Sequence, residues 1–112
     1  MQINGILETA LYVADPALAA AFYRRLFGFA KLLESERLVA LDVAGKNVLL
    51  LFCIGATGEG NDTGKGIIPG HAGGPPANFA FSISSGDVEP WRTKLESEGI
   101  VVESIVTWPR GA

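Results

Sequence analysis

The hexapeptide ETALYV at residues 8–13 alternates between two kinds of side chain and predicts a β-strand with two different faces. A helix-patterned run follows it and ends at Gly28. Further along, NFAFSI at residues 78–83 predicts a second strand, and the helix-patterned run after it ends in the same way at Gly99. This repeat of strand, helix and glycine predicts two similar modules, with any binding site between them.

The first helix-patterned run has recognisable start and stop signals. Asp15 is a favourable N-cap, and the proline after it is accepted in a first helical turn. Gly28 is expected to end the helix because glycine adopts the left-handed conformation at little cost. The apolar residues at helical spacing, which are expected to cover the preceding strand, are Leu18, Phe22 and Leu26.

Three further short β runs complete the first half of the chain. They are expected at residues 30–35, 38–43 and 48–53, and turn-forming residues separate them. Together with the strand and helix before them, they predict a βαβββ module that spans residues 1–53.

Residues 54–77 have a different composition, because they carry eight of the fourteen glycines and three prolines. Such a segment is expected to form a long irregular connection between modules or over a site. The pair Gly64 and Lys65 suggests a phosphate-binding loop, but the first glycine of that motif would fall on Glu59 and its hydroxyl position on Gly66. A linker is therefore the better interpretation.

The second half, residues 78–112, predicts part of another module. Asp87 is expected to cap a helix, and after Gly99 the apolar residues between 100 and 106 predict another strand. The expected apolar stripe of this helix consists of Val88, Trp91 and Leu95. Two strands of a complete module would then be missing, which makes a truncated protein one of the open interpretations.

Composition narrows the class of protein. With 112 residues and 48% hydrophobic content, the chain is expected to form a single domain. A net charge of −3 without a basic cluster argues against a nucleic-acid partner. No segment is typical of a signal peptide or membrane span, and the single cysteine, Cys53, suits a reducing compartment. We therefore expect a cytoplasmic protein that binds neither nucleic acid nor membrane.

Four segments together resemble a known family. They are YVAD at residues 12–15, FYRRLFGF at 22–29, NFAF at 78–81 and VTWPRG at 106–111. In this combination they are similar to the vicinal oxygen chelate superfamily, which includes glyoxalase I, bleomycin-resistance proteins and extradiol dioxygenases. The resemblance implies an α+β fold of tandem βαβββ modules, the second of them incomplete.

The resemblance also implies a site for one divalent metal ion, Mn, Ni, Zn, Fe(II) or Mg. Glu8 stands where the family places a metal ligand on the first strand. Asn78 stands at the matching position of the second module, which is usually histidine, and is a weak second ligand. The family's glutamate on the fourth strand is replaced by the apolar run 49–52, so a site without any metal is an equally open interpretation. His71, in the glycine-rich loop, is expected to be in solvent, with metal binding as the alternative.

Alternation along the two repeated strands predicts a ligand-binding face independently of the family. On each strand, the side opposite the helix stripe carries small or polar residues, which suit a ligand floor better than a packed core. Candidate substrate-binding residues are Ala10, Tyr12, Phe52, Asn78, Ser82 and Trp108. For Tyr12, Phe52 and Trp108 the alternative is packing in the core.

Three functions remain open at this point. The first is a metal-dependent lyase or dioxygenase, with Glu8 as a metal ligand. The second is a metal-free protein that binds or sequesters a small molecule, such as a drug, by hydrophobic enclosure. The third is a truncated relic without catalytic activity. If Ala112 is the true C-terminus, the incomplete second module leaves an unpaired sheet edge, which would favour a homodimer.

Overall fold

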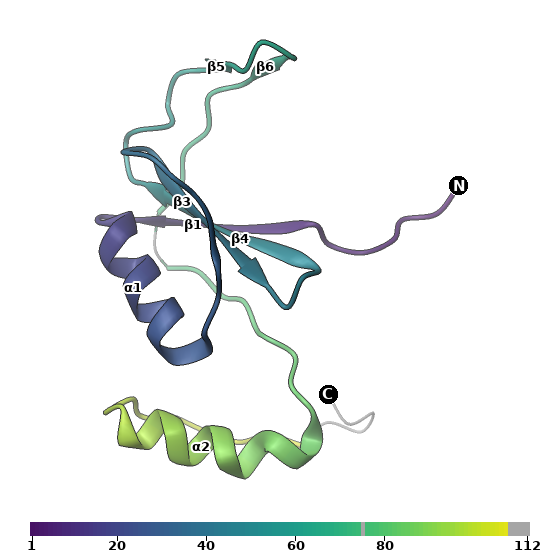
Figure 1. The fold of residues 1–112 in the computed structure, drawn as a ribbon, viewed down its shortest axis with the longest axis vertical. Coiled ribbons are helices and arrows are strands. Elements are labelled where there is room, and N and C mark those ends of the chain that lie inside the picture. Colours follow the sequence, from purple (N-terminus) through teal and green to yellow (C-terminus); the bar gives the residue numbers. More distant parts are fainter. Residues whose placement is uncertain (75, 108–112) are drawn as a thin grey trace. The chain divides into compact units, whose positions relative to one another are not determined.

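The computed structural model describes residues 1–74 and 76–107 and divides into two compact units, Met1–Asn78 and Phe79–Ala112. The elements of the first unit are β1 (Glu8–Val13), α1 (Pro16–Phe27), β2 (Lys31–Glu34), β3 (Leu38–Val43), β4 (Asn47–Cys53), β5 (Asn61–Asp62) and β6 (Ile67–Ile68) (Figure 1). The described part of the second unit contains the short 3-10 helix η1 (Ser85–Asp87) and the helix α2 (Val88–Ser97).

The main sheet of the first unit has the strand order β1-β4-β3-β2. β1 runs parallel to β4, and the other two pairings are antiparallel. A parallel pair needs a crossover connection, which α1 and the β2–β3 hairpin provide between β1 and β4. The first unit is therefore a complete βαβββ module, as the sequence predicts.

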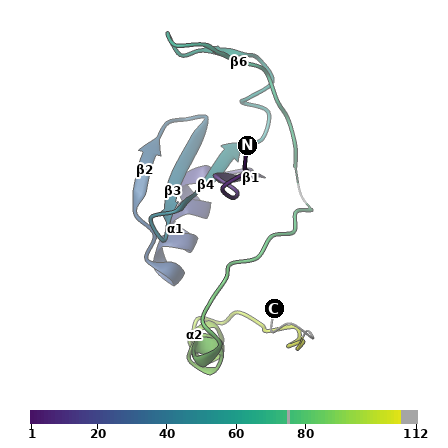
Figure 2. The same ribbon diagram turned by 90° about the vertical axis from the view of Figure 1, so that its right-hand side faces the viewer.

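The core of this unit lies between α1 and one face of the sheet. α1 packs against β3 and β4 and extends along that face (Figure 2). The largest fully buried core side chains are Leu26, Val39, Leu41, Leu49 and Leu51. On the strands these residues alternate with more exposed ones, because successive side chains point to opposite faces.

The ends of α1 are as predicted, but its buried face is not. The Leu18 backbone N–H donates to Asp15 Oδ1 at 3.1 Å, and Gly28 ends the helix with φ 71°. Leu26 is buried at 1% exposure, whereas Leu18 and Phe22 are 70% and 38% exposed, so their predicted packing is wrong. Ala20 faces the sheet instead, and its small side chain allows the helix backbone to come close to the strands.

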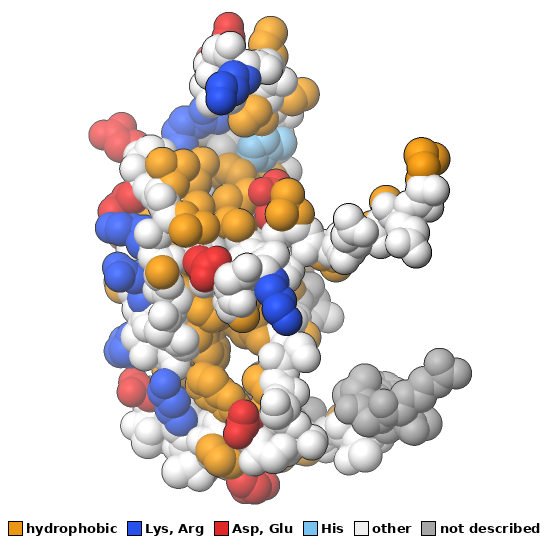
Figure 3. Space-filling view, turned by 45° about the vertical axis from the view of Figure 1, so that its right-hand side comes forward, with side chains coloured by type: hydrophobic (Ala, Val, Ile, Leu, Met, Phe, Trp, Pro, Cys, Tyr) orange, Lys and Arg blue, Asp and Glu red, His pale blue; other side chains and the backbone are white. Residues whose placement is uncertain are grey.

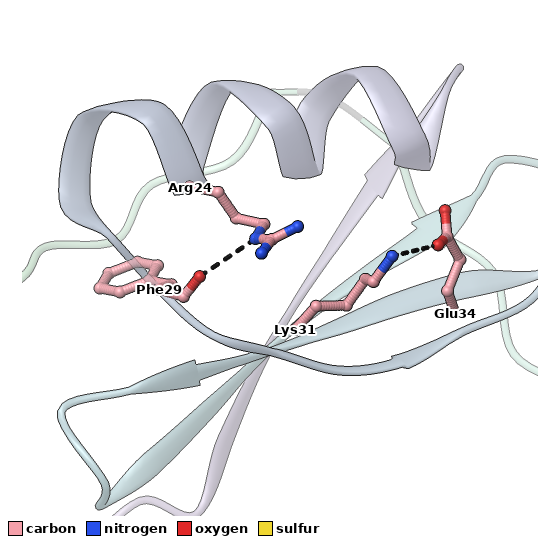
Figure 4. Close-up of polar contacts among 4 residues, drawn as sticks. All are labelled: Arg24, Phe29, Lys31 and Glu34. Carbon is pink, nitrogen blue, oxygen red and sulfur yellow. Dashed lines mark hydrogen bonds and ion pairs between the residues drawn. The ribbon is translucent and has the colours of Figure 1, made fainter.

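Exposed polar contacts lie at the C-terminal end of α1 and in β2 (Figure 4). Arg24 Nε donates to the backbone oxygen of Phe29 at 3.2 Å, and Lys31 Nζ lies 2.6 Å from Glu34 Oε2. Because these groups are exposed, the Lys31–Glu34 ion pair contributes at most about 1 kcal/mol to stability. Packing of the core, not these contacts, therefore determines the fold.

The long connection after β4 contains little regular structure, as its composition predicts. Among the described residues of this connection, the one regular feature is the ribbon of β5 and β6, in which Asn61 pairs with Ile68 and Asp62 with Ile67. Gly64, with φ 80°, lies in the turn between these two strands. No helix follows this turn within the described part of the connection, which agrees with the rejection of a phosphate-binding loop.

In the second unit the predicted helix forms, but the predicted strands do not. α2 follows Asp87 directly, although the Asp87 side chain makes no capping hydrogen bond. Residues 78–83 and 100–106 form no strand in the described structure. A strand needs a partner: β1 obtains its hydrogen bonds from β4, and the described residues of the second unit contain no equivalent of β4. Phe79 and Phe81 still share one side, with ring centroids 5.3 Å apart.

None of the helices in the described residues is long and apolar enough to cross a membrane.

Candidate functional site

The face of the sheet opposite α1 carries the residues that alternation predicts for a ligand floor. Three rows of this face follow from the strand register: Glu8, Val48 and Asp42; Ala10, Leu50 and Ala40; and Tyr12, Phe52 and Leu38. We call these nine residues the open face. Ala10 is exposed and Leu50 is half-buried, so the middle of this face is apolar and accessible.

An aromatic pair stands at one end of the open face. Tyr12 and Phe52 are register partners on β1 and β4, and their rings stack with centroids 5.6 Å apart and an interplanar angle of 28°. Phe52 is 9% exposed. The structure therefore brings together two of the predicted substrate-binding residues.

His71 lies against this aromatic pair, although its place in the sequence predicts exposure to solvent. Its ring meets Phe52 edge-on at a centroid distance of 4.6 Å and Tyr12 at 5.8 Å. The Tyr12 hydroxyl is 2.7 Å from His71 Nδ1. His71 is half-buried, so the predicted exposure of this side chain is wrong.

Two hydrogen bonds hold His71 in this position. The backbone N–H of His71 donates to the Thr57 carbonyl at 2.8 Å, and Thr57 Oγ1 donates to the His71 carbonyl at 2.7 Å. Thr57 is only 1% exposed, which makes it the one buried polar residue among the described residues. These two hydrogen bonds thus join the two ends of the loop formed by residues 58–70.

Gly73 provides a further contact between the connection and the open face. A Cβ atom at this position would lie 2.5 Å from the Cδ2 and Cε2 atoms of Tyr12, so only glycine fits without a shift. The backbone after His71 therefore passes directly over the Tyr12 ring. Neither this contact nor the role of Thr57 has a signal in the local sequence.

The predicted metal ligands, Glu8 and Asn78, are both exposed in the first unit. Glu8 is exposed at the end of the open face opposite the aromatic pair. Asp42 shares its row but stands two strands away, about 10 Å across the sheet. Asp42 Oδ2 also accepts a hydrogen bond from Gly45 N at 3.1 Å. No group of three or more His, Cys, Asp or Glu side chains is placed to hold an ion within residues 1–74 and 76–107.

The remaining predicted residues lie away from this cluster. Asn78 is exposed at the end of the first unit, and Ser82 is exposed in the second unit. Trp108 is outside the described residues. The second unit also has a shallow hollow beside α2, lined by Asp87, Pro90, Trp91 and Lys94, which contains none of the predicted residues.

A tyrosine outside the site has a shifted pKa. Tyr23, on α1, is half-buried, and burial raises the pKa of its hydroxyl above the usual 10.0. Tyr23 is therefore neutral at physiological pH and is part of the packing of α1.

The surface around His71 is largely hydrophobic. In Figure 3 the histidine lies next to a continuous group of hydrophobic side chains, with acidic side chains nearby. An apolar surface with an aromatic end and few polar groups is typical of sites that bind small organic molecules.

Comparison with known proteins agrees with this architecture. The model of the Glyoxalase/Bleomycin resistance protein/Dioxygenase superfamily matches residues 5–108. The chain belongs to this superfamily, which confirms the resemblance and the predicted α+β fold class. Comparison with curated proteins gives no match.

Solved structures of similar fold include a lactoylglutathione lyase from Agrobacterium tumefaciens. It is 33% identical, with a TM-score of 0.85 over 99% of this chain and 82% of that one. An integron cassette protein from the mobile metagenome of the Halifax Harbour sewage outfall is 23% identical, with a TM-score of 0.68 over 97% and 93%. The fosfomycin resistance protein FosX from Listeria monocytogenes is 16% identical, with a TM-score of 0.64 over 98% and 77%. The last two share the fold alone with this chain.

Proposed function

We propose that this protein binds a small molecule with a flat apolar part on its open face. The observation that supports this most directly is the stacked pair of Tyr12 and Phe52 with His71 at its edge. In the described part of the first unit the only helix, α1, packs on the other face of the sheet. The open face therefore offers an apolar floor at Ala10 and Leu50, bordered by the aromatic pair and His71, that this helix does not cover.

The energetics of the open face favour an apolar ligand. Aromatic contacts contribute about 0.5–1.5 kcal/mol beyond the burial of area, and Tyr12 and Phe52 are already held in place by their strand register. Ala10, one row away, is small and exposed, so it leaves room for a ligand above the sheet. A ligand here would gain affinity without first ordering the surface that it contacts.

The proposal can be tested by calorimetric titration of the full chain with 2-naphthoate in the presence of EDTA. Ala10→Leu fills the space above the middle row and is expected to weaken binding at least about tenfold. Ala17→Leu is the matched control, because Ala17 is exposed on α1, and it should leave the affinity unchanged. Equal affinity of both variants would reject the open face as the binding site.

Lactoylglutathione lyase activity is a second candidate function. Its support is the 33% identity to a lactoylglutathione lyase over 99% of this chain. The metal ion that the superfamily implies has two candidate ligands here, Glu8 and Asn78, and the described residues supply no group of three acidic, histidine or cysteine ligands. We therefore derive no catalytic step through a metal.

This second candidate has its own experiment. Lactoylglutathione formation is measured with the wild type and with Glu8→Gln after addition of Mn, Ni, Zn, Fe(II) or Mg. A metal-dependent rate that Glu8→Gln abolishes would establish the lyase and its ligand. Calorimetry that detects none of these ions on the wild type would remove Glu8 as a metal ligand and leave the metal-free binding function.

A further inference from the structure

We infer that His71 is a ligand-binding residue of the open face, and that the bound molecule carries an oxygen acceptor, such as a carbonyl or carboxylate group, beside its flat apolar part. This inference rests on the proposed function. It deepens that function because it names the chemical class of the ligand and the residue that orients it.

The first support is the position of the imidazole ring. His71 contacts both members of the aromatic pair, Phe52 at a centroid distance of 4.6 Å and Tyr12 at 5.8 Å. Both contacts are edge-on, with interplanar angles of 70° and 66°. The ring is half-buried, so it forms the border of the apolar surface rather than part of its core.

The second support is the hydrogen bond that determines where the ring proton lies. Tyr12 Oη and His71 Nδ1 are 2.7 Å apart, and this is the only hydrogen bond of the Tyr12 hydroxyl within the described residues. The distance alone fits either direction, and as part of this inference the phenol is assigned as the donor and Nδ1 as the acceptor, which gives the half-buried hydroxyl a partner within the described residues. A neutral imidazole with Nδ1 as an acceptor carries its proton on Nε2.

The third support is the state of Nε2 itself. Among the described residues, the only side-chain hydrogen bond of His71 is the one through Nδ1. The Nε2–H group is thus a donor at the border of an apolar surface, without an acceptor among the described residues. A single donor at the edge of an apolar site is the usual means by which such a site orients a ligand oxygen.

The fourth support is the rigidity of the segment that carries His71. The two hydrogen bonds to Thr57 and the contact of Gly73 with the Tyr12 ring hold the backbone on both sides of the histidine. A donor that is already held in place loses little conformational entropy when a ligand binds. The chain thus places a fixed donor next to a flat apolar surface.

The test compares two probes with the same ring system on the full chain. One is 2-naphthoate, which has a carboxylate, and the other is (2-naphthylmethyl)trimethylammonium, which has no acceptor. His71→Asn retains a polar group near Nδ1 only, whereas His71→Gln retains an N–H group near the position of Nε2. We expect 2-naphthoate to bind about tenfold more weakly to His71→Asn, with a smaller loss for His71→Gln. The cationic probe should bind all three proteins alike.

An NMR titration of the wild type provides a readout that packing alone would not affect. The Nε2 resonance of His71 should shift on addition of 2-naphthoate and stay in place with the cationic probe. If the variants lose affinity for both probes equally, His71 only packs against the site, and the inference fails while the proposed function stands. If the wild type binds neither probe, the proposed function fails as well.

Discussion

The carbonyl groups of Thr57 and His71 both accept hydrogen bonds from the other residue of the pair. His71 N donates over 2.8 Å and Thr57 Oγ1 over 2.7 Å, which closes the loop between them. Thr57 is nearly completely buried, so water cannot replace its hydroxyl easily. This pair therefore determines whether His71 reaches the aromatic pair at all.

Thr57→Val tests this closure. The variant keeps the shape of the side chain but leaves the His71 carbonyl without its hydroxyl partner, which should lower the free energy of unfolding by about 1–3 kcal/mol. Hydrogen exchange at His71 N should become faster. Thr63→Val is the control, since Thr63 Oγ1 makes a similar bond, to Gly66 O at 2.9 Å, in an exposed turn. Equal effects of the two changes would contradict the role of Thr57.

The close approach of Gly73 to Tyr12 leads to a second prediction. Gly73→Ala places a methyl group 2.5 Å from ring atoms of Tyr12, so either the ring or the connection must move. We expect a loss of about 1–3 kcal/mol in stability and a change in the Tyr12 ring resonances. Gly74→Ala is the neighbouring control, because a Cβ there would meet nothing within 4 Å. A neutral Gly73→Ala variant would show that the connection does not lie on Tyr12.

The packing of α1 gives a third prediction. Leu26→Ala removes a side chain that is 1% exposed and should cost about 2–5 kcal/mol in the free energy of unfolding. Leu18→Ala changes the same residue type at a position that is 70% exposed, and should cost less than about 0.5 kcal/mol. Denaturant unfolding of both variants measures the difference. Similar losses would indicate that Leu18 is buried together with Leu26, as the helical spacing predicts.

Local signals in the sequence were sufficient for the elements of the first unit. The period of two at residues 8–13, the cap at Asp15 and the glycine at position 28 each act within a few residues, and the structure contains all three features. The buried side of α1 is not a local property. Large apolar residues predicted one face, but Ala20 faces the sheet because a small residue permits close packing.

The candidate site depended on contacts that no local pattern contains. Tyr12 and His71 are separated by 59 positions in the chain, and the loop between them closes through Thr57, a residue without a distinctive motif. Alternation along residues 8–13 correctly predicts that Ala10 and Tyr12 share the open face, because the strand period decides which side chains lie on one side. The strands predicted in the second unit do not form in the described residues, because a strand requires a partner that its own sequence does not specify.

The raised pKa of Tyr23 gives a prediction for alkaline solution. Burial raises this pKa in the folded chain above 10.0, so the unfolded chain loses the proton first as pH rises. The contribution of Tyr23 to stability is therefore complete below about pH 10 and is lost as pH rises through the higher folded value. Tyr23→Phe should show a smaller decrease in stability above pH 10. Thermal unfolding of the wild type and the variant between pH 8 and 11 measures this difference. The same pH dependence of stability in both proteins would contradict the raised pKa of Tyr23.

The unpaired side of β1 leads to the last prediction. β1 is at the edge of its sheet, and the residues before it, Ile6 and Leu7, are 74% and 72% exposed. We propose that a second copy of the chain covers this edge, because exposed apolar edges favour association. Light scattering should then give about twice the chain mass of 11.8 kDa.

Substitution at this edge decides whether it is the interface. Ile6→Lys should weaken the dimer about tenfold or more, because a lysine in the contact would lose its hydration without a partner. Val101→Lys is the control, since Val101 is 80% exposed in the other unit, and it should leave the mass unchanged. A wild type that stays at 11.8 kDa at all concentrations would reject the dimer. A dimer that Ile6→Lys does not weaken would place the interface elsewhere.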